Sequence, residues 1–507
     1  MNYASLNSTA KIKLKTIADL KAVGYQSVGV KDELRNNLIQ KIKNKENVFE
    51  GIWGYENTVI PEVERAILSR HNINFLGLRG QAKTRLARMM VQLLDEYIPA
   101  IKGSDLNDDP LIPISYFAVQ QIKELGDQTP IIWIHRDERY TEKLATPDVS
   151  IADLIGDVDP IKAATLKLPY SDERVIHYGL IPRAHRGLFV INELPDLQAR
   201  IQVALFNILQ EGDIQIRGFK LRMPLDIQFV FTANPEDYTN RGSIVTPLKD
   251  RIDSQIITHY PNSIELSKKI TAQEAHLKQE QKDKINTFEL AKDLIEEIAM
   301  EARKSEFVDA KSGVSARLTI SAYENLISTA ERRALIHGED KTSLRISDFM
   351  GVTPSITGKI ELVYEGEQEG SNTIAHNLIS KAIRAQFVHY FPNPLEAKKD
   401  KKKTNPYLSI TNWFEQGNMV DILRDANHKE YKKTLDSVSG LKDLVDFFHK
   451  DLDKDAKLFL MEFVLYGLSE YSMLSKHTLE TGATFKDLLS SMFSMPTMDD
   501  EQENEEQ

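Results

Sequence analysis

Residues 77–84, which read Gly-Leu-Arg-Gly-Gln-Ala-Lys-Thr, constrain the fold of this chain more than any other segment. They follow a mainly apolar run at 73–76 and open a helical stretch at 85–94. A glycine-containing loop between a strand and a helix can wrap its backbone N–H groups around a phosphate. In that setting Lys83 reaches the outer phosphate oxygens and the Thr84 hydroxyl ligates Mg²⁺. The segment therefore predicts an α/β fold with a phosphate-binding loop.

One position of this loop departs from the common pattern. Ala82 stands where such loops usually carry glycine. A methyl group is tolerated there if the local φ is negative, so the prediction of phosphate binding survives the change. The alternative is an ordinary strand–helix turn with an accidental lysine, which short motifs always leave open. Residues farther along the chain argue against that alternative.

The region around this loop alternates short β-rich runs with helical stretches. Apolar runs separated by helices are typical of a parallel sheet that is covered by helices on both faces. The predicted strands lie at 73–78, 131–135, 188–191, 227–232 and 255–259.

The pattern changes to helices after residue 261. Apolar residues at helical spacing predict helices over 285–303 and 318–336. The remaining segments, each predicted from its composition, are a strand-like piece at 359–365, a lysine-rich linker at 392–403, a helical region at 407–494 whose apolar stretch 458–468 must be buried, and a disordered acidic tail at 499–507.

Composition excludes several classes of function. The chain has 507 residues and a net charge of −11, which argues against broad nucleic-acid binding. It has 0 cysteines, so disulfides, zinc–thiolate sites and iron–sulfur clusters are excluded. No run approaches about 18 apolar residues, so we expect no membrane segment and a cytoplasmic location.

Polar residues follow two of the predicted strands. Glu193 follows a buried strand, where it could orient or deprotonate an attacking water. Asn192 precedes it where an aspartate is usual; its side-chain oxygen can still accept a hydrogen bond from a Mg²⁺-bound water, but it brings no charge. This predicts weak Mg²⁺·ATP binding or slow turnover, and improvement on Asn192→Asp substitution. Asn234 follows the run 227–232 and could hold both a terminal phosphate and the water.

Two arginines complete the pattern. Arg251 follows Leu248 and Asp250 and precedes the fifth strand, and Arg317 opens a predicted helix. Each alone would be a surface charge, and Arg251 could simply pair with Asp250 or Asp253. After the loop, Glu193 and Asn234, we expect both arginines to contact phosphate.

The order of these features resembles AAA+ ATPases. The loop at 77–84 is similar to that of MoxR-type ATPases, and the stretches 153–159 and 179–187 resemble the ATPase subunit of magnesium chelatase. The resemblance covers about 48–345. Residues 1–45 and 370–507 match no family that we can name.

The resemblance implies a role for each site residue. It makes ATP and Mg²⁺ the cofactors, Asn234 sensor 1, Arg251 an arginine finger acting on a neighbouring subunit, and Arg317 sensor 2. It also places a family insertion within about 150–180. The implied catalytic residues are Glu193, Asn234, Arg251 and Arg317, the metal residues Thr84 and Asn192, and the ATP-binding residues Gly77, Gly80, Gln81, Ala82, Lys83, Thr84, Ile52, Gly54 and Tyr55.

The implied fold is a P-loop AAA+ core with a central parallel five-stranded sheet, followed by a helical lid and a helical C-terminal domain. The predicted divisions are an N-terminal helical segment at 1–45, the α/β nucleotide-binding core at 46–262, a helical lid with sensor 2 at 263–350, a connector and linker at 351–406, a C-terminal helical domain at 407–494 and an acidic tail at 495–507.

The resemblance also bears on function. It implies an ATP-hydrolysing remodelling or chaperone-like machine that forms a homo-oligomeric ring, six-membered in such families. Since no Asp-x-Ser-x-Ser metal-site signature is present, a von Willebrand A domain would belong to a separate partner protein. Three alternatives stay open: a magnesium chelatase ATPase subunit, a nucleotide-switched scaffold with weak hydrolysis, and an AAA+ transcription activator. We see no convincing helix-turn-helix sequence for the last.

Overall fold

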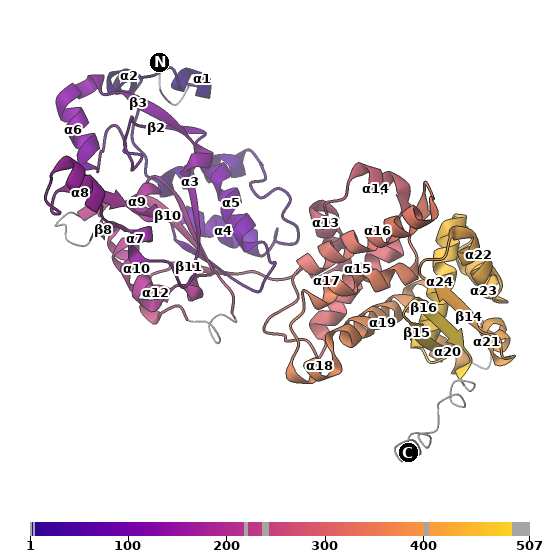
Figure 1. Ribbon diagram of the computed structural model, residues 1–507. Coiled ribbons are helices and arrows are strands. Elements are labelled where there is room, and N and C mark those ends of the chain that lie inside the picture. The colour runs from indigo at the N-terminus through magenta and orange to yellow at the C-terminus, as the bar shows by residue number, and fades with distance from the viewer. Residues whose placement is uncertain (1–2, 4–5, 217–221, 236–242, 400–404, 489–507) are drawn as a thin grey trace, which may run out of the picture. The chain divides into compact units, whose positions relative to one another are not determined.

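The chain divides into two units between Tyr260 and Pro261. The computed structural model describes residues 3, 6–216, 222–235, 243–399 and 405–488. The first unit comprises Met1–Tyr260 and the second Pro261–Gln507 (Figure 1). In the described part of the chain, no helix is both long and apolar enough to cross a membrane.

The first unit is built on a five-stranded parallel sheet with the strand order β11-β1-β10-β7-β4. This confirms the predicted α/β class and the central sheet. Because every strand runs the same way, the carboxyl ends of all of them meet at one edge. The strands are β1 (Ile73–Leu76), β4 (Tyr140–Leu144), β7 (Gly187–Asn192), β10 (Ile227–Ala233) and β11 (Ser254–Ile257).

Both faces of the sheet are covered, which explains why its central strands are continuously apolar. Leu188 and Val190 of β7 belong to one hydrophobic core, and Phe189 and Ile191 of the same strand belong to the other. The first core includes residues of α3 (Val30–Lys43), α4 (Val59–Leu68) and α5 (Lys83–Met89), and the second includes residues of α10 (Ala199–Glu211) and α12 (Thr246–Lys249).

The prediction that 131–135 is a central strand is wrong. That segment is β3 (Ile131–His135), which pairs antiparallel with β2 (Tyr97–Ile101) outside the central sheet. Its apolar character comes from packing against Ile17 and Leu20 near the N-terminus. The fifth strand of the sheet is β4, a partly buried edge strand whose sequence Tyr-Thr-Glu-Lys-Leu is too polar to resemble a core strand.

Further short elements surround the sheet. A hairpin of β5 and β6 with α8 between its strands lies within 150–180, where the family insertion was expected. The bounds are α1 Ser8–Lys11, α2 Ile17–Ala22, α6 Tyr116–Leu125, α7 Ile151–Leu154, β5 Gly156–Val158, α8 Pro160–Leu166, β6 Ile176–Tyr178, α9 Leu180–Arg183, β8 Asp213–Gln215 and β9 Arg222–Pro224.

The second unit is mainly helical. The two predicted helices are α15 (Glu289–Lys304) and α16 (Arg317–His337), and the apolar stretch 458–468 is buried within α24 (Lys454–Glu470). One hydrophobic core contains residues from Ile285 to Phe485. The other helices are α13 Ile264–Glu274, α14 Gln279–Lys284, α17 Thr353–Thr357, α18 Tyr364–Glu369, α19 Ser371–Tyr390, α20 Pro394–Lys399, α21 Leu408–Glu415, α22 His428–Asp436 and α23 Leu441–Phe448.

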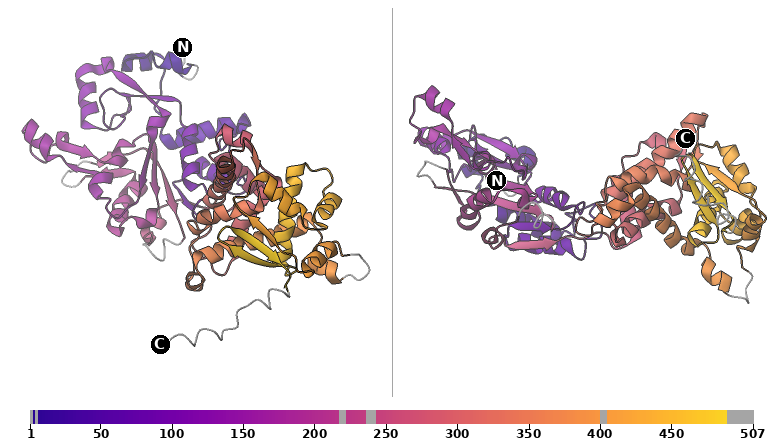
Figure 2. Two further views of the ribbon diagram at one scale, coloured as in Figure 1. Left: turned by 45° about the vertical axis from the view of Figure 1, so that its right-hand side comes forward. Right: turned by 60° about the horizontal axis from the view of Figure 1, so that its bottom comes forward.

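Two details of this unit differ from the predictions. The C-terminal region is helical, as predicted, but it also contains an antiparallel sheet in the order β14-β16-β15, drawn side by side in yellow in Figure 2. The strand-like piece predicted at 359–365 forms one β-bridge, between Leu362 and Val308. It does not form a longer strand, because the helix α18 begins at Tyr364. The strands are β12 Ile285–Asn286, β13 Thr342–Ser343, β14 Val420–Leu423, β15 Ser475–Leu479 and β16 Gly482–Lys486. The acidic tail lies outside the described residues.

A buried ion pair fixes the start of the edge strand β4. Arg139 donates two hydrogen bonds to the carboxylate of Glu33 on α3, at 2.7 and 2.6 Å. The side chains are 1% and 6% exposed, and the same carboxylate accepts a bond from the Asp95 backbone N–H. Removing one partner would leave the other charge buried without compensation. The pair therefore ties β4 to α3, one of the helices that cover the sheet.

We predict that Glu33→Gln lowers the free energy of unfolding of the first unit by about 3–5 kcal/mol, since Arg139 loses its countercharge. The neighbouring Asp32→Asn is the control, because Asp32 pairs with Arg70 at the surface and should cost less than about 1 kcal/mol. Urea unfolding followed by tryptophan emission in a Trp413→Phe background reports on Trp53 and Trp133 of the first unit. Equal losses for the two variants would contradict a special role for the buried pair.

Candidate functional site

The predicted phosphate loop connects β1 to α5, as its sequence requires. Neighbouring side chains leave no room for a Cβ atom on the first glycine, Gly77, where it would lie 2.0 Å from Thr258 Oγ1. Gly80 has a φ of +73°, which glycine adopts without strain. The local geometry therefore favours glycine at both positions, and the loop packs closely against the end of β11.

Ala82 does not have the negative φ on which the sequence argument relied. Its φ is +56° and its ψ is 18°, in the left-handed region. This is the conformation for which a glycine is favoured, and an L-residue with a Cβ costs roughly 1–2 kcal/mol there. The loop thus keeps the backbone path that glycine would allow, at the expense of local strain.

The Lys83 ammonium lies at the centre of the loop. It donates hydrogen bonds to the backbone carbonyls of Gly77 and Leu78, the latter at 2.9 Å. It also donates to Asn234 Oδ1 at 2.7 Å, which joins the loop to the residue that follows β10. Two of the predicted site residues, Lys83 and Asn234, are therefore in direct contact.

The Asn192 side chain joins the loop to two strands. Its Oδ1 accepts hydrogen bonds from Thr84 Oγ1 at 3.2 Å and from Thr232 Oγ1 at 3.1 Å. Its Nδ2 donates to Glu142 Oε1 at 2.5 Å. Asn192 is only 8% exposed, so these bonds account for its buried polar atoms. The predicted metal residues Thr84 and Asn192 are thus neighbours.

Glu193 begins the segment after β7 in a left-handed conformation, with a φ of +56°. Its backbone N–H donates to Thr232 Oγ1 at 3.1 Å. Within the described residues, its carboxylate forms no hydrogen bond or ion pair with another side chain. Non-glycine residues in this backbone region concentrate at functional sites. The arrangement leaves the Glu193 carboxylate available to a water molecule.

The segment with the other predicted ATP-binding residues, Ile52, Gly54 and Tyr55, packs against the same loop. Ile52 is buried, and Gly54 has a φ of +82°. The Tyr55 hydroxyl lies 3.0 Å from the Gln81 carbonyl and 2.8 Å from the His259 carbonyl. Burial raises the pKa of Tyr55 to about 12, so the hydroxyl remains a donor. Gln81 also accepts a bond from Thr258, so this segment, the loop and the end of β11 are joined.

The two arginines are not brought to the loop within the first unit. Arg251 donates to Gln210 Oε1 at 3.0 Å and to the Pro247 carbonyl at 2.7 Å, and it lies over the Phe206 ring. In the described part of the chain it forms no ion pair with Asp250 or Asp253. Arg317 is exposed at the first position of α16, in the second unit.

Sequence reasoning missed two side chains of this site. Thr232 is the one hydroxyl in the apolar part of β10, and that polar position was the available signal. Glu142 gave no signal, because its strand was not recognised as part of the sheet. Its carboxylate also accepts bonds from Arg88 Nε and from the Tyr140 hydroxyl, each at 2.9 Å.

The residues around Thr84 fit a nucleotide-bound Mg²⁺. Oxygen atoms of hydroxyl, amide and carboxylate groups suit this ion and the waters bound to it, and the ion commonly keeps waters while bridging to substrate phosphates. Within the described residues there is no group of at least three histidine or carboxylate side chains that could hold a metal ion alone.

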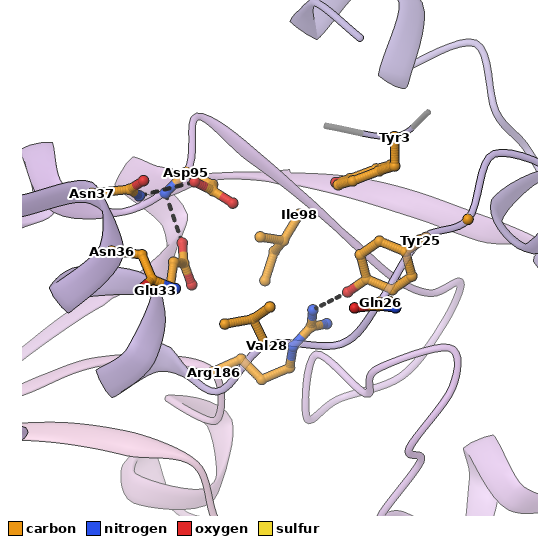
Figure 3. A pocket seen from close by; sticks show the side chains of 11 residues that line it. Tyr3, Tyr25, Gln26, Val28, Glu33, Asn36, Asn37, Asp95, Ile98 and Arg186 are labelled. Carbon is orange, nitrogen blue, oxygen red and sulfur yellow. Dashed lines mark hydrogen bonds between the residues drawn. The ribbon is translucent and has the colours of Figure 1, made fainter. Parts of the chain in front are cut away.

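A separate cavity of about 360 Å³ lies near the N-terminus (Figure 3). Arg186 donates to the Tyr25 hydroxyl at 3.1 Å, and Asn37 donates to Asp95 at 2.9 Å. These charged and amide groups are engaged with one another, and none of the predicted nucleotide residues lines the cavity. The loop, and not this cavity, is therefore the candidate functional site.

Comparisons with known proteins find relatives by sequence and by structure. The Sigma-54 interaction domain family matches residues 169–257. A magnesium-chelatase 38 kDa subunit from Cereibacter sphaeroides is 24% identical over 197 residues, 37% of this chain and 51% of that protein. The same subunit from Rhodobacter capsulatus is 26% identical over 192 residues, 37% and 49% of the two chains. The chain thus spans about half the length of the curated relatives it matches.

Solved structures align with low scores. A complex of magnesium chelatase subunits BchI and BchD covers 63% of this chain and 98% of that chain at 19% identity, with a TM-score of 0.33. A RuvB variant from Thermotoga maritima covers 76% and 96% at 12% identity, with a TM-score of 0.34. The sequence matches by themselves agree with the predicted resemblance to AAA+ ATPases of the magnesium-chelatase type.

We predict that Ala82→Gly keeps or raises the stability of the first unit. Removing the Cβ relieves about 1–2 kcal/mol of left-handed strain, while glycine adds about 0.5–1 kcal/mol of chain entropy to the unfolded state. The control Ala87→Gly, inside α5, should lose about 1 kcal/mol or more. Urea unfolding of both variants in the Trp413→Phe background compares them. Equal destabilisation would mean that Ala82 is not strained.

Proposed function

We propose that this chain binds Mg²⁺·ATP at residues 77–84 and hydrolyses it as an oligomeric AAA+ remodelling ATPase. The observation that carries the proposal is the meeting of loop and strand ends. Lys83 contacts Asn234 after β10, and Thr84 contacts Asn192 at the end of β7. Ligands of parallel α/β sheets bind at this edge, outside the carboxyl ends of the strands.

The loop residues have separate tasks in this proposal. The Lys83 ammonium donates hydrogen bonds to loop carbonyls and to Asn234. Phosphate oxygens of ATP would replace some of these acceptors. Thr84 and Asn192 supply the oxygens beside which Mg²⁺ is held. When bound, the ion neutralises charge on the phosphates. Asn234 stays next to Lys83, where an amide can contact both a phosphate and a water.

Glu193 is the proposed residue that orients the attacking water. Its carboxylate is uncommitted among the described side chains, and Thr232 holds its backbone N–H at 3.1 Å. The same threonine donates to Asn192, so one hydroxyl connects the water-activating residue to the metal residue. A movement of Asn192 caused by nucleotide or metal would therefore be transmitted to Glu193 through the two hydrogen bonds of Thr232.

Arg251 is proposed to act on the nucleotide of a neighbouring subunit. Its partners Gln210 and Pro247 belong to α10 and the α12 turn, and neither belongs to the chain's own loop. A ring, six-membered by resemblance, brings such an arginine to the next site. Arg317 is proposed as sensor 2, by analogy alone, because it belongs to the second unit.

The pathway in which this ATPase works is a further part of the proposal. We favour remodelling of a client protein with a separate von Willebrand A partner. The two chelatase relatives support the alternative of an ATPase subunit for metal insertion. The uncharged Asn192 supports a nucleotide-switched scaffold with weak hydrolysis. The rate of phosphate release by the purified oligomer separates the weakly hydrolysing scaffold from both ATPases, and porphyrin metallation with added chelatase subunits separates the two ATPases.

A second candidate function follows from the family match. Residues 169–257 match the Sigma-54 interaction domain, which favours an ATP-driven activator of transcription. The matched range contains Asn192, Glu193, Asn234 and Arg251 but not the phosphate loop. ATP-dependent binding to a σ54 protein in a pull-down would support this candidate, and its absence would leave the remodelling proposal.

We predict that Lys83→Ala weakens ATP binding by roughly 10- to 100-fold, since a charge-assisted hydrogen bond contributes about 1.5–3 kcal/mol. Titration calorimetry with ATP and Mg²⁺ measures the affinity. Lys123→Ala, which removes an exposed lysine from α6, is the matched control and should leave the affinity unchanged. If Lys83→Ala binds ATP as tightly as the wild type, the site is wrongly assigned.

We predict that Arg251→Ala and Glu193→Gln subunits, each inactive alone, regain ATPase activity when mixed. A site with an intact Glu193 can then receive Arg251 from its neighbour, and such arginines contribute about 10³–10⁵ to the rate of related phosphoryl transfers. Arg200→Ala, which removes an exposed arginine from α10, should remain active alone. Mixed oligomers that stay inactive would exclude the action of Arg251 across a subunit boundary.

A further inference from the structure

The edge strand β4 places a carboxylate beside the uncharged metal residue. β4 pairs with β7 so that Glu142 is opposite Val190 and Leu144 is opposite Asn192. Glu142 and Asn192 are therefore diagonal neighbours on one face of the sheet, within reach of each other. Their contact is a hydrogen bond of 2.5 Å from Asn192 Nδ2 to Glu142 Oε1.

This hydrogen bond determines which way the Asn192 amide faces. An ionised carboxylate can only accept, so the amide nitrogen must face Glu142. The amide oxygen is then turned toward Thr84 and Thr232, whose hydroxyls can donate to it. Without Glu142, both orientations of the amide could form hydrogen bonds with the two hydroxyls, because a hydroxyl donates or accepts.

The other hydrogen bonds of Glu142 hold its carboxylate beside Asn192. Its other oxygen, Oε2, accepts hydrogen bonds from Arg88 and from the Tyr140 hydroxyl. The Glu142 side chain is 22% exposed, whereas that of Arg88 is 63% exposed. The arginine charge is therefore more strongly screened by water than the carboxylate that it contacts. A negative charge remains one hydrogen bond away from the amide whose oxygen lies beside Thr84.

We propose that Glu142 is a positioning residue that supplies, through the Asn192 amide, the negative charge that an aspartate usually brings to the metal residue of such sites. The inference rests on the proposed function, because it concerns Mg²⁺ bound with a nucleotide at the same loop. Outer partners of metal-site residues typically change metal affinity by about 10- to 100-fold when they are replaced.

The position of Glu142 changes the effect expected for Asn192→Asp. From the sequence alone, this substitution adds a negative charge that would improve Mg²⁺·ATP binding or turnover. In the structure it replaces a donor by a second carboxylate 2.5 Å from Glu142, so a hydrogen bond becomes a repulsion. The single substitution should therefore bring little gain. Combined with Glu142→Gln it moves the charge from one side chain to the other, and the glutamine amide introduced on β4 can donate to the new aspartate.

The test compares ADP affinity in Mg²⁺ with ADP affinity in EDTA, by calorimetry on the full chain. The ratio of the two measures the magnesium contribution. Glu142→Gln should lower this ratio about 10- to 100-fold while the affinity in EDTA stays unchanged. Glu124→Gln, on the exposed side of α6, is the matched control and should keep the wild-type ratio. Arg88→Gln removes the ion pair but leaves the Glu142 charge, and it should also keep the ratio.

The double variant Glu142→Gln/Asn192→Asp separates a charge effect from a structural one. We expect it to recover most of the wild-type ratio, which a variant with a damaged fold could not do. A wild-type ratio in Glu142→Gln, or a double variant as weak as Glu142→Gln, would overturn the inference and leave the proposed function intact. If the wild type binds ADP in neither buffer, the proposed function fails and this inference with it.

Discussion

The hydrogen bonds of one buried amide, that of Asn192, hold the candidate site together. They join α5 through Thr84, β10 through Thr232 and β4 through Glu142. Each partner comes from a different element, so the site forms only when the parallel sheet has its observed strand order. The buried pair of Arg139 and Glu33 fixes the start of β4 and thus the position of Glu142.

Strain at two backbone positions accompanies this network. Ala82 and Glu193 both have a φ of +56°, which costs an L-residue about 1–2 kcal/mol. Ala82 lies in the loop after β1 and Glu193 directly follows β7, so both lie at the same edge of the sheet. Strain of this kind persists where the surrounding contacts over-determine the backbone, and the hydrogen bond from Glu193 N–H to Thr232 is one such contact.

Much of this architecture could be predicted from the sequence, because its buried strands and helices carry apolar patterns of clear period. The strand β7 and the helices α15 and α16 are in this class, whereas the phosphate loop could be predicted from its glycines, lysine and threonine between a strand and a helix. The edge strand β4 could not be predicted, since a partly buried strand needs few apolar residues, and the apolar β3 took its place in the prediction. Glu142 was missed for the same reason, because its contact with Asn192 depends on which strand lies beside β7. The residue type of Ala82 gives no indication that its φ is left-handed.

A crystal structure with Mg²⁺ and a non-hydrolysable ATP analogue tests the central claim most directly. We expect the triphosphate along residues 77–84, the metal ion beside Thr84, and the Asn192 side chain still in hydrogen-bond contact with Glu142. A nucleotide bound elsewhere, such as in the cavity beside Tyr25 and Arg186, would contradict the assignment of the site. A metal ion beside Thr84 with Glu142 separated from Asn192 would contradict the role of the edge strand.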